Sequence, residues 1–291
     1  MIPGSFEYHH PGSLDEAIAL LSSLGDDAKV LSGGQSLIPM MKLRLAEPAH
    51  LIDINGLTDL EYIKESDGYL TIGALTREAD LDRSDVIGKK YAVIHDTAHV
   101  IADPQVRNLA TIGGNLAHGD PANDHPATML ALRAEVVATG PNGPRTIPID
   151  DFFIGPLTTA LAPNEILTEL RIPAPTQGSG GAYLKLERKV GDFAIAGVAA
   201  VVTLDGSGNC TLAGIGLTNV GPTPLRATAA EKFLLGKPLS DDNIAEGGRM
   251  AGEASQPTSD HRGSAEYKRA MVKEMTIRAL KKAKARAEGE Q

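Results

Sequence analysis

The spacing of apolar residues changes along the chain, and this change limits the folds that the chain can adopt. Early in the sequence apolar residues recur at helical spacing, and Ser13 followed by Glu16 forms a capping box, so we expect a helix that Gly25 ends. From Gly56 the pattern becomes the alternation typical of antiparallel strands. The last third places strands first and helices after them. This order indicates an α+β protein.

The 291 residues predict three units, over 1–55, 56–176 and 177–291. The clearest linker is Pro173–Gly181, and the third unit is expected to hold a three-stranded antiparallel sheet followed by helices. We expect strands over 29–31, 51–54, 62–65, 69–73, 135–139, 166–172, 182–190, 194–204 and 210–218. Beyond the first helix, we expect helices from 36 to 45, at 91–101, up to 132, and at 224–235, 241–254 and 264–287, with a polar, Gly-rich stretch at 103–125.

Composition excludes several classes of protein. The net charge of −9 argues against a protein that binds nucleic acid by neutralising phosphates. The longest apolar stretch, residues 193–202, is far shorter than the roughly 20 residues that span a bilayer, so we expect no membrane span. No signal peptide is visible, which favours the cytoplasm. The single cysteine, Cys210, permits neither an internal disulfide nor a cluster of thiolate ligands.

Two glycine-rich segments are candidates for phosphate binding. They are Ser32-Gly33-Gly34-Gln35-Ser36 and Thr111-Ile112-Gly113-Gly114-Asn115. Adjacent glycines let backbone N–H groups converge on an anion, and a following helix adds a favourable dipole. Two such segments could hold the two phosphates of a dinucleotide between them. Glycine pairs also occur at ordinary turns, so on the residues alone both interpretations stay open.

A third candidate is the segment 118–125, which brings together His118, Asp120, Asp124 and His125. Histidine and carboxylate ligands suit a divalent metal. The alternative is a turn at Gly119 and Pro121 followed by a helix cap. A serine hydrolase is disfavoured because the chain has no G-x-S-x-G motif.

Five stretches of sequence together resemble the flavoprotein (medium) subunit of the molybdenum hydroxylases, the family of xanthine dehydrogenase and aerobic carbon monoxide dehydrogenase. These stretches are SGGQSLIPMMKLRL, LIDIN, YLTIGALT, IADPQVRNLATIGGNLAHGDPAND and KLERKVGDFAIAGVAA. The resemblance covers nearly the whole chain in order. It implies an α+β protein with an FAD-binding fold of the vanillyl-alcohol-oxidase type, in which two α/β subdomains clasp FAD and a C-terminal α+β domain follows.

The resemblance also implies which residues contact FAD. The segments Ser32–Ser36 and Thr111–Asn115 match those that hold the diphosphate, and Asp124 matches an acidic residue on the adenosine side. Ile101, Ala102, Leu167 and Lys185 match positions near the cofactor. Phe193 stands where relatives often have Tyr, and its ring is suited to cover the isoalloxazine. The alternative for Phe193 is a core position in the third unit.

The resemblance finally implies the chemistry and the partners. Relatives hydroxylate substrate at a molybdenum cofactor in a large subunit and pass electrons through two [2Fe–2S] clusters in a small subunit to FAD and then to an external oxidant. We therefore expect an electron-transfer subunit with no catalytic acid–base residues, in a dimer of heterotrimers, with the stretch His99–Asn108 at an interface. The alternatives are a stand-alone FAD-dependent oxidase, a metal-dependent enzyme using the 118–125 cluster, and a non-catalytic nucleotide-binding module.

Overall fold

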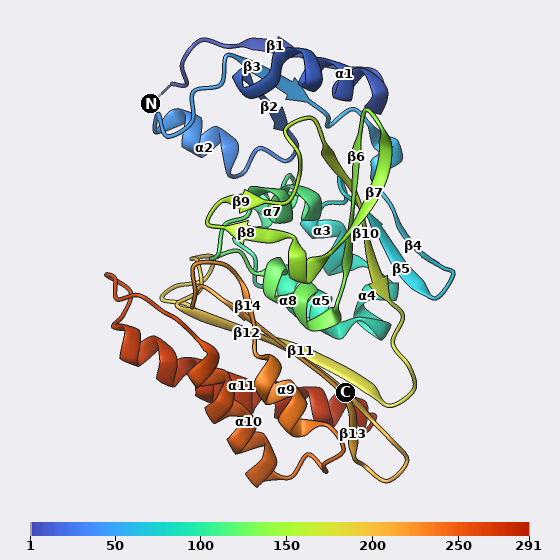
Figure 1. Ribbon diagram of the computed structural model, residues 1–291, viewed down its shortest axis with the longest axis vertical. Helices are drawn as coiled ribbons and strands as arrows, with labels where there is room; N and C mark the ends of the chain where they lie inside the picture. Colours follow the sequence, from blue (N-terminus) through green and yellow to red (C-terminus); the bar gives the residue numbers. More distant parts are fainter. Residues whose placement is uncertain (1, 291) are drawn as a thin grey trace.

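The structure is a computed structural model, and it describes residues 2–290. Its elements form three successive blocks, which we call the N-terminal block (elements within 7–60), the middle block (63–173) and the C-terminal block (179–287). They follow one another from the top to the bottom of Figure 1. Within residues 2–290, no helix is both long and apolar enough to cross a membrane.

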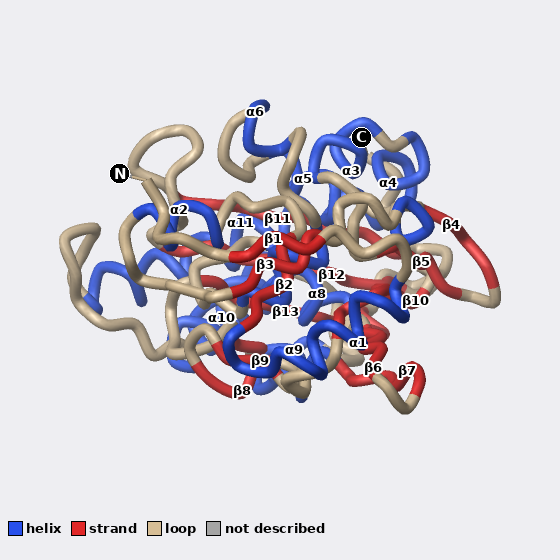
Figure 2. The backbone as a smooth tube through the Cα atoms, turned by 90° about the horizontal axis from the view of Figure 1, so that it is seen from above, coloured by secondary structure: helices blue, strands red, loops and turns tan. Residues whose placement is uncertain are grey.

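The N-terminal block is a small parallel sheet with two α-helices. Its elements are β1 (Glu7–His9), α1 (Leu14–Leu24), η1 (Gly25–Asp27), β2 (Ala28–Leu31), α2 (Leu37–Lys42), β3 (His50–Asp53) and η2 (Thr58–Leu60). The strands lie in the order β1-β3-β2. The expected helix is confirmed: Ser13 Oγ accepts the N–H of Glu16 at 3.2 Å, and Gly25 ends the helix with a φ of 57°. Figure 2 shows this sheet near the centre of the molecule when it is seen from above.

Two details of this block differ from the sequence prediction. The strand β1 was not expected, because three mostly exposed residues carry no readable alternation. The helix α2 ends at Lys42 and not at Leu45, and the side chain of Ser36 makes no capping hydrogen bond. The chain leaves the helix through Arg44, whose φ of 61° is left-handed.

The middle block is a five-stranded antiparallel sheet packed against helices. Its strands lie in the order β4-β5-β10-β6-β7. The elements are β4 (Ile63–Ser66), β5 (Tyr69–Gly73), α3 (Glu78–Arg83), α4 (Asp85–Lys90), α5 (Ala92–His99), α6 (Pro104–Arg107), α7 (Ile112–His118), α8 (His125–Leu132), β6 (Glu135–Gly140), β7 (Gly143–Pro148), η3 (Ile149–Asp151), β8 (Phe153–Gly155), β9 (Thr158–Thr159) and β10 (Ile166–Pro173). Its core joins the buried sheet residues Leu70 and Ile72 to the helices through residues such as Ile94 and Met129.

The stretch 103–125 is more regular than its composition suggested. It holds α6 and α7, and a side chain caps each helix: Asp103 Oδ1 accepts the N–H of Val106 at 2.9 Å, and Thr111 Oγ1 accepts the N–H of Gly114 at 3.2 Å. Capping therefore starts a helix even though two glycines lie in its first turn. The edge strand β7 was missed because only one of its six residues is buried.

The C-terminal block confirms the three expected long strands and adds a short fourth one. Its elements are β11 (Ser179–Leu186), β12 (Ala196–Leu204), β13 (Cys210–Thr218), β14 (Leu225–Arg226), α9 (Thr228–Leu234), α10 (Asp241–Ala254) and α11 (Ala265–Ala287), and the sheet order is β11-β12-β13-β14. The strand β14 has two residues, which is too short for a sequence signal.

The end of the predicted linker is strand and not loop. Residues 179–181 belong to β11, and a Cβ on Gly180 would lie 2.1 Å from the carbonyl oxygen of Ala283 in α11. On β13, a Cβ on Gly216 would lie 1.9 Å from the carbonyl oxygen of Ala127 in α8. Glycine thus permits helices to approach this sheet closely, and α8 ties the middle block to the C-terminal block.

Candidate functional site

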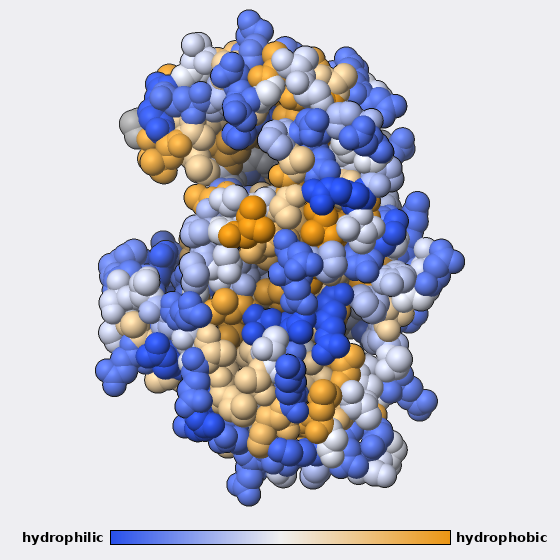
Figure 3. Space-filling view, in the orientation of Figure 1, coloured by the Kyte–Doolittle hydropathy of each residue, from blue (hydrophilic) through white to orange (hydrophobic). Residues whose placement is uncertain are grey.

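A cavity of about 590 Å³ opens where the three blocks meet. Its size lies within the roughly 300–1,000 Å³ that is usual for cofactor pockets. Figure 3 shows the molecule hollowed on its left side between the N-terminal block and the block below it. Of the sixteen residues that the sequence predicts for a cofactor site, all except Ile112 line the cavity: Ser32, Gly33, Gly34, Gln35, Ser36, Ile101, Ala102, Thr111, Gly113, Gly114, Asn115, Asp124, Leu167, Lys185 and Phe193.

The first glycine-rich segment, residues 32–36, connects β2 to α2, and most of its backbone N–H groups have no hydrogen-bond acceptor among residues 2–290. Gly34 has a φ of 73°, which favours glycine, and the side-chain amide of Gln35 donates to the carbonyl of Gly33 at 3.0 Å. Within residues 2–290, the backbone N–H groups of Gly33, Gly34, Gln35 and Ser36 have no hydrogen-bond acceptor. Four adjacent N–H donors without acceptors at a cavity wall are suited to bind an anionic group.

The second segment, residues 111–115, differs from the open nest that the sequence suggested. It forms the start of α7, and its amides from Ile112 to Asn115 already have acceptors: Gly113 N–H donates to the carbonyl of Ala74 at 3.0 Å, and Gly114 N–H donates to Thr111 Oγ1. This segment instead presents a side-chain acceptor, that of Asn115, to the cavity. Asn115 Oδ1 is buried and has no hydrogen-bond partner among residues 2–290. A buried acceptor without a partner is costly unless a ligand supplies the donor.

Ile112 lies apart from the other predicted residues. Its side chain is fully buried in the core of the middle block, and its N–H donates to the carbonyl of Thr76 at 3.1 Å. The apolar residue of this segment therefore anchors α7, and the cavity wall is made by the residues on either side of it.

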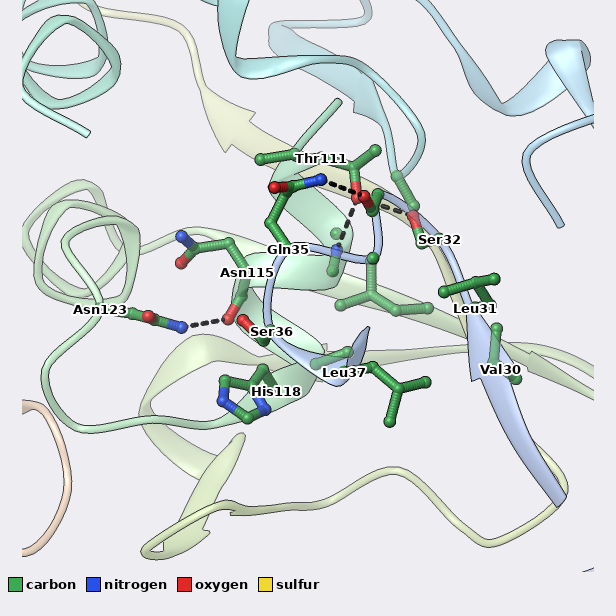
Figure 4. Close-up of a pocket in the computed structure, with 18 of the residues that line it drawn as sticks. Val30, Leu31, Ser32, Gln35, Ser36, Leu37, Thr111, Asn115, His118 and Asn123 are labelled. Carbon is green, nitrogen blue, oxygen red and sulfur yellow. Dashed lines mark hydrogen bonds between the residues drawn. The ribbon is translucent and has the colours of Figure 1, made fainter. Parts of the chain in front are cut away.

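The two segments touch directly although they are 79 residues apart. The hydroxyls of Ser32 and Thr111 lie 2.7 Å from each other. A dashed line marks this contact in Figure 4. A Cβ on Gly33 would lie 2.3 Å from the carbonyl oxygen of Leu109, so glycine is required for this approach. The convergence of the two segments, which the sequence suggested, is present in the fold.

Both carboxylate oxygens of Asp124 already have hydrogen-bond partners within the protein. Tyr183 donates its hydroxyl to one oxygen, and Lys185 Nζ lies 2.9 Å from the other. Both the Asp124 and Lys185 side chains are less than a tenth exposed, and Lys185 also donates to the carbonyl of Val100 at 3.2 Å. Burial, followed by the neighbouring charge of Asp124, raises the pKa of Tyr183 well above its usual value, so this phenol stays a donor.

Phe193 lies at the rim of the cavity and not in the core of the C-terminal block. Its exposed fraction is 46%, so the core alternative is wrong. The loop that carries it rests on the middle block: a Cβ on Gly191 would lie 3.0 Å from the carbonyl oxygen of Ala102. Ile101 and Leu167, in contrast, are buried apolar residues of the wall.

The four residues of the proposed metal cluster do not converge. His125 is fully buried and lies 2.6 Å from Glu78, and Asp124 is held by Tyr183 and Lys185. His118 Nε2 is 4.0 Å from Asp120, and the His118 side chain lines the cavity. Burial lowers the pKa of His118, against an opposing effect of Asp120, so a neutral imidazole faces the cavity at neutral pH.

Sequence reasoning missed several cavity residues. The loop before β10 contributes Leu161, Ala162, Pro163 and Glu165, and Asn123 lies beside the second segment and donates to the carbonyl of Asn115 at 2.7 Å (Figure 4). The loop has neither a glycine pair nor a charged cluster, and its position depends on a sheet that assembles from distant strands.

Comparison with known proteins agrees with this geometry. The family model described as "FAD binding domain in molybdopterin dehydrogenase" matches residues 4–175, and that described as "CO dehydrogenase flavoprotein C-terminal domain" matches residues 181–283. The carbon monoxide dehydrogenase medium chains of Hydrogenophaga pseudoflava and Afipia carboxidovorans are 49% and 48% identical, with 98% and 99% of this chain and 99% of each relative covered. A solved structure of carbon monoxide dehydrogenase from Hydrogenophaga pseudoflava matches with a TM-score of 0.95 at 50% identity, covering 98% of this chain and 99% of that chain.

Proposed function

The chain belongs to the family of FAD-binding medium subunits of molybdenum-dependent dehydrogenases, and from this premise we propose that its central cavity holds one FAD. The observation that carries the proposal is the row of backbone N–H groups from Gly33 to Ser36 at the cavity wall, which have no acceptor among residues 2–290. These donors suit the diphosphate. The buried Asn115 Oδ1 gains a donor when a polar group enters the cavity.

The other predicted residues take supporting roles in this proposal. Ile101 and Leu167 give the cavity an apolar wall that excludes water, and Phe193 covers the ring from the rim. Asp124 and Lys185 act as a buried pair that fixes β11 to the middle block beside the cofactor. We propose the division 1–55, 56–176 and 177–291 as the corresponding domains.

Bound flavin supplies the electron-transfer chemistry, and the chain supplies its binding, orientation and shielding. The chain itself holds one cysteine, Cys210, which is buried in the C-terminal block. We therefore propose that electrons reach the flavin from [2Fe–2S] clusters of a small partner subunit, after substrate oxidation at a molybdenum cofactor of a large one, and leave to an external oxidant. The finer points, a dimer of heterotrimers in the cytoplasm, are part of the same proposal.

A stand-alone oxidase is less well supported. Such an enzyme would bind its own substrate over the flavin under an additional cap. The sheet of the C-terminal block instead packs between α8 of the middle block and its own helices α9 and α11, and α10 packs on those two helices.

Flavin content tests the proposal. Asn115→Leu removes an acceptor that has no partner among residues 2–290, so it should lower FAD content several-fold while leaving secondary structure unchanged. Gly34→Leu should also lose FAD, because the backbone there is left-handed. The matched control is Gly206→Leu, since a Cβ at Gly206 meets open space. Full flavin content in both site variants would overturn the assignment.

A further inference from the structure

The N-terminal block holds a cluster of metal-ligand side chains that lies outside the cavity. It consists of Glu7 and His9 on β1 and His50 on β3, and one ligand atom from each lies within 4.8 Å of the others. None of the three lines the cavity described above. Among residues 2–290, no other three histidine, cysteine, aspartate or glutamate side chains bring their ligand atoms this close together. We propose that it binds a divalent transition-metal ion of the zinc class.

Strand register explains why the three side chains meet. The strands β1 and β3 are parallel neighbours, and Glu7 pairs with His50 while His9 pairs with Ile52. Side chains two apart on a strand point to the same face, so Glu7, His9 and His50 share one face of the sheet. Tyr8 points to the other face, where its hydroxyl donates to Asp53 at 2.6 Å. Figure 1 shows the two strands side by side at the top of the molecule.

The distances between the donor atoms fit a tetrahedral ion. His9 Nε2 and His50 Nδ1 are 3.1 Å apart, and His50 Nδ1 is 3.4 Å from Glu7 Oε2. An ion with bonds of about 2.0–2.1 Å to nitrogen and oxygen holds tetrahedral ligands about 3.3 Å apart. The third pair, His9 and Glu7, has ligand atoms within 4.8 Å of each other, so side-chain rotation that brings these two closer would direct the three donors to one point.

The chemistry of the donors selects the class of ion. Two imidazoles and one carboxylate suit Zn²⁺, Ni²⁺ or Cu²⁺, whereas Mg²⁺ and Ca²⁺ prefer oxygen alone. Without an ion, one imidazole must donate its proton to the other across the 3.1 Å contact. With an ion, both facing nitrogens coordinate it as lone-pair donors, and each ring keeps its proton on its other nitrogen.

Exposure leaves the site accessible from solution. The Glu7 side chain is 75% exposed and that of His50 is 20% exposed. A water molecule can therefore complete the coordination, as in sites with three protein ligands. Because the ion would join β1 to β3, it would hold the three-residue edge strand in place, and binding to the folded state alone raises stability.

The test uses the full-length chain after treatment with a chelator, titrated with zinc chloride by calorimetry. We expect one ion per chain and a higher thermal unfolding midpoint with zinc. Glu7→Gln and His9→Ala should weaken zinc binding by at least about tenfold, the lower end of what losing even an outer-shell partner costs. His10→Ala is the matched control, because His10 is adjacent in sequence but outside the cluster, and it should bind zinc as the unmodified chain does.

Cobalt provides a second readout that does not depend on stability. Co²⁺ should give the visible absorption of a tetrahedral site in the unmodified chain and in His10→Ala, and lose it in His9→Ala. The proposal is wrong if the unmodified chain takes up no zinc, or if His9→Ala and His10→Ala bind it equally. Because the cluster is separate from the cavity, either result leaves the flavin assignment unaffected.

Discussion

Lys185 Nζ lies 2.9 Å from Asp124 Oδ2, and both side chains are buried beside the cavity. The pair links β11 of the C-terminal block to the segment before α8 in the middle block. Removing one partner of a buried ion pair leaves the other charge uncompensated. Asp124 is therefore a structural residue as well as a cavity residue.

Asp124→Ala should destabilise the protein by about 3 kcal/mol, the lower end of the cost of breaking a buried ion pair, because Lys185 would keep only the Glu187 carboxylate, which is farther away at 3.6 Å and more exposed. This differs from the simple expectation that a ligand-facing residue can be replaced without cost to the fold. Chemical denaturation measures the loss. The double variant Asp124→Leu, Lys185→Met should recover most of it, since neither charge of the buried Asp124–Lys185 pair is left and Glu187 keeps partial access to solvent. A single variant as stable as the unmodified chain would contradict the structural role.

Thr111→Val should weaken both the fold and flavin binding. The variant loses the cap of α7 and the contact with Ser32, and loss of a cap costs about 1 kcal/mol. Ser13→Ala is the matched control, because it removes a helix cap outside the cavity. Both variants should lower the unfolding free energy, and only Thr111→Val should lower FAD content. Equal FAD content in the two variants would show that the Ser32–Thr111 contact does not shape the site.

Particular residues show how far the sequence could predict this structure and why it could not go further. Local signals were sufficient for α1, where Ser13 and Gly25 mark the two ends. They also identified the glycine-rich segments, whose side chains converge in the fold. The sequence alone did not show what each glycine does. Gly180, for example, indicates a turn by composition, whereas in the fold it allows α11 to pack on β11. Whether an amide is free likewise depends on distant acceptors such as the Ala74 carbonyl.

Phe193→Ala should leave stability nearly unchanged and alter the flavin. The ring is 46% exposed at the rim of the cavity, so little core packing is lost. We expect changed flavin fluorescence and a changed rate of reoxidation, because the cofactor would become more accessible to solvent and oxidant. Tyr267→Ala in α11 is the control, since this aromatic is 43% exposed and does not line the cavity. Unchanged flavin properties would remove Phe193 from the site.

Asp96→Asn should make stability less dependent on acidic pH. Burial acts to raise the pKa of Asp96, but hydrogen bonds from Arg286 and the charges of Arg286 and Lys282 outweigh it, so the pKa lies below 3.8. The folded state thus binds this proton less tightly than the unfolded state does. The stabilisation is fully present above 3.8 and is lost as the pH falls through the lower folded pKa.

Urea unfolding at neutral pH and again below 3.8 measures this effect. The difference between the two free energies should be smaller in Asp96→Asn than in the unmodified chain. Asp241→Asn is the control, because its pair with Lys281 is mostly exposed and contributes little. An identical acid dependence in Asp96→Asn would mean that this contact between α5 and α11 does not couple proton binding to folding.

The isolated chain should show no substrate turnover, even when it carries FAD. Two [2Fe–2S] clusters need about eight thiolate ligands, and this chain has one cysteine, which is buried. Electrons must therefore enter from another polypeptide. The stretch His99–Asn108 is a suitable place for contact, since Ile101, Ala102 and Val106 line the cavity and α6 lies at the edge of the molecule in Figure 2. Expressing the chain alone and together with its iron–sulfur and molybdenum partners tests this. Substrate oxidation by the isolated chain at the rate of the co-expressed complex would contradict a role limited to electron transfer.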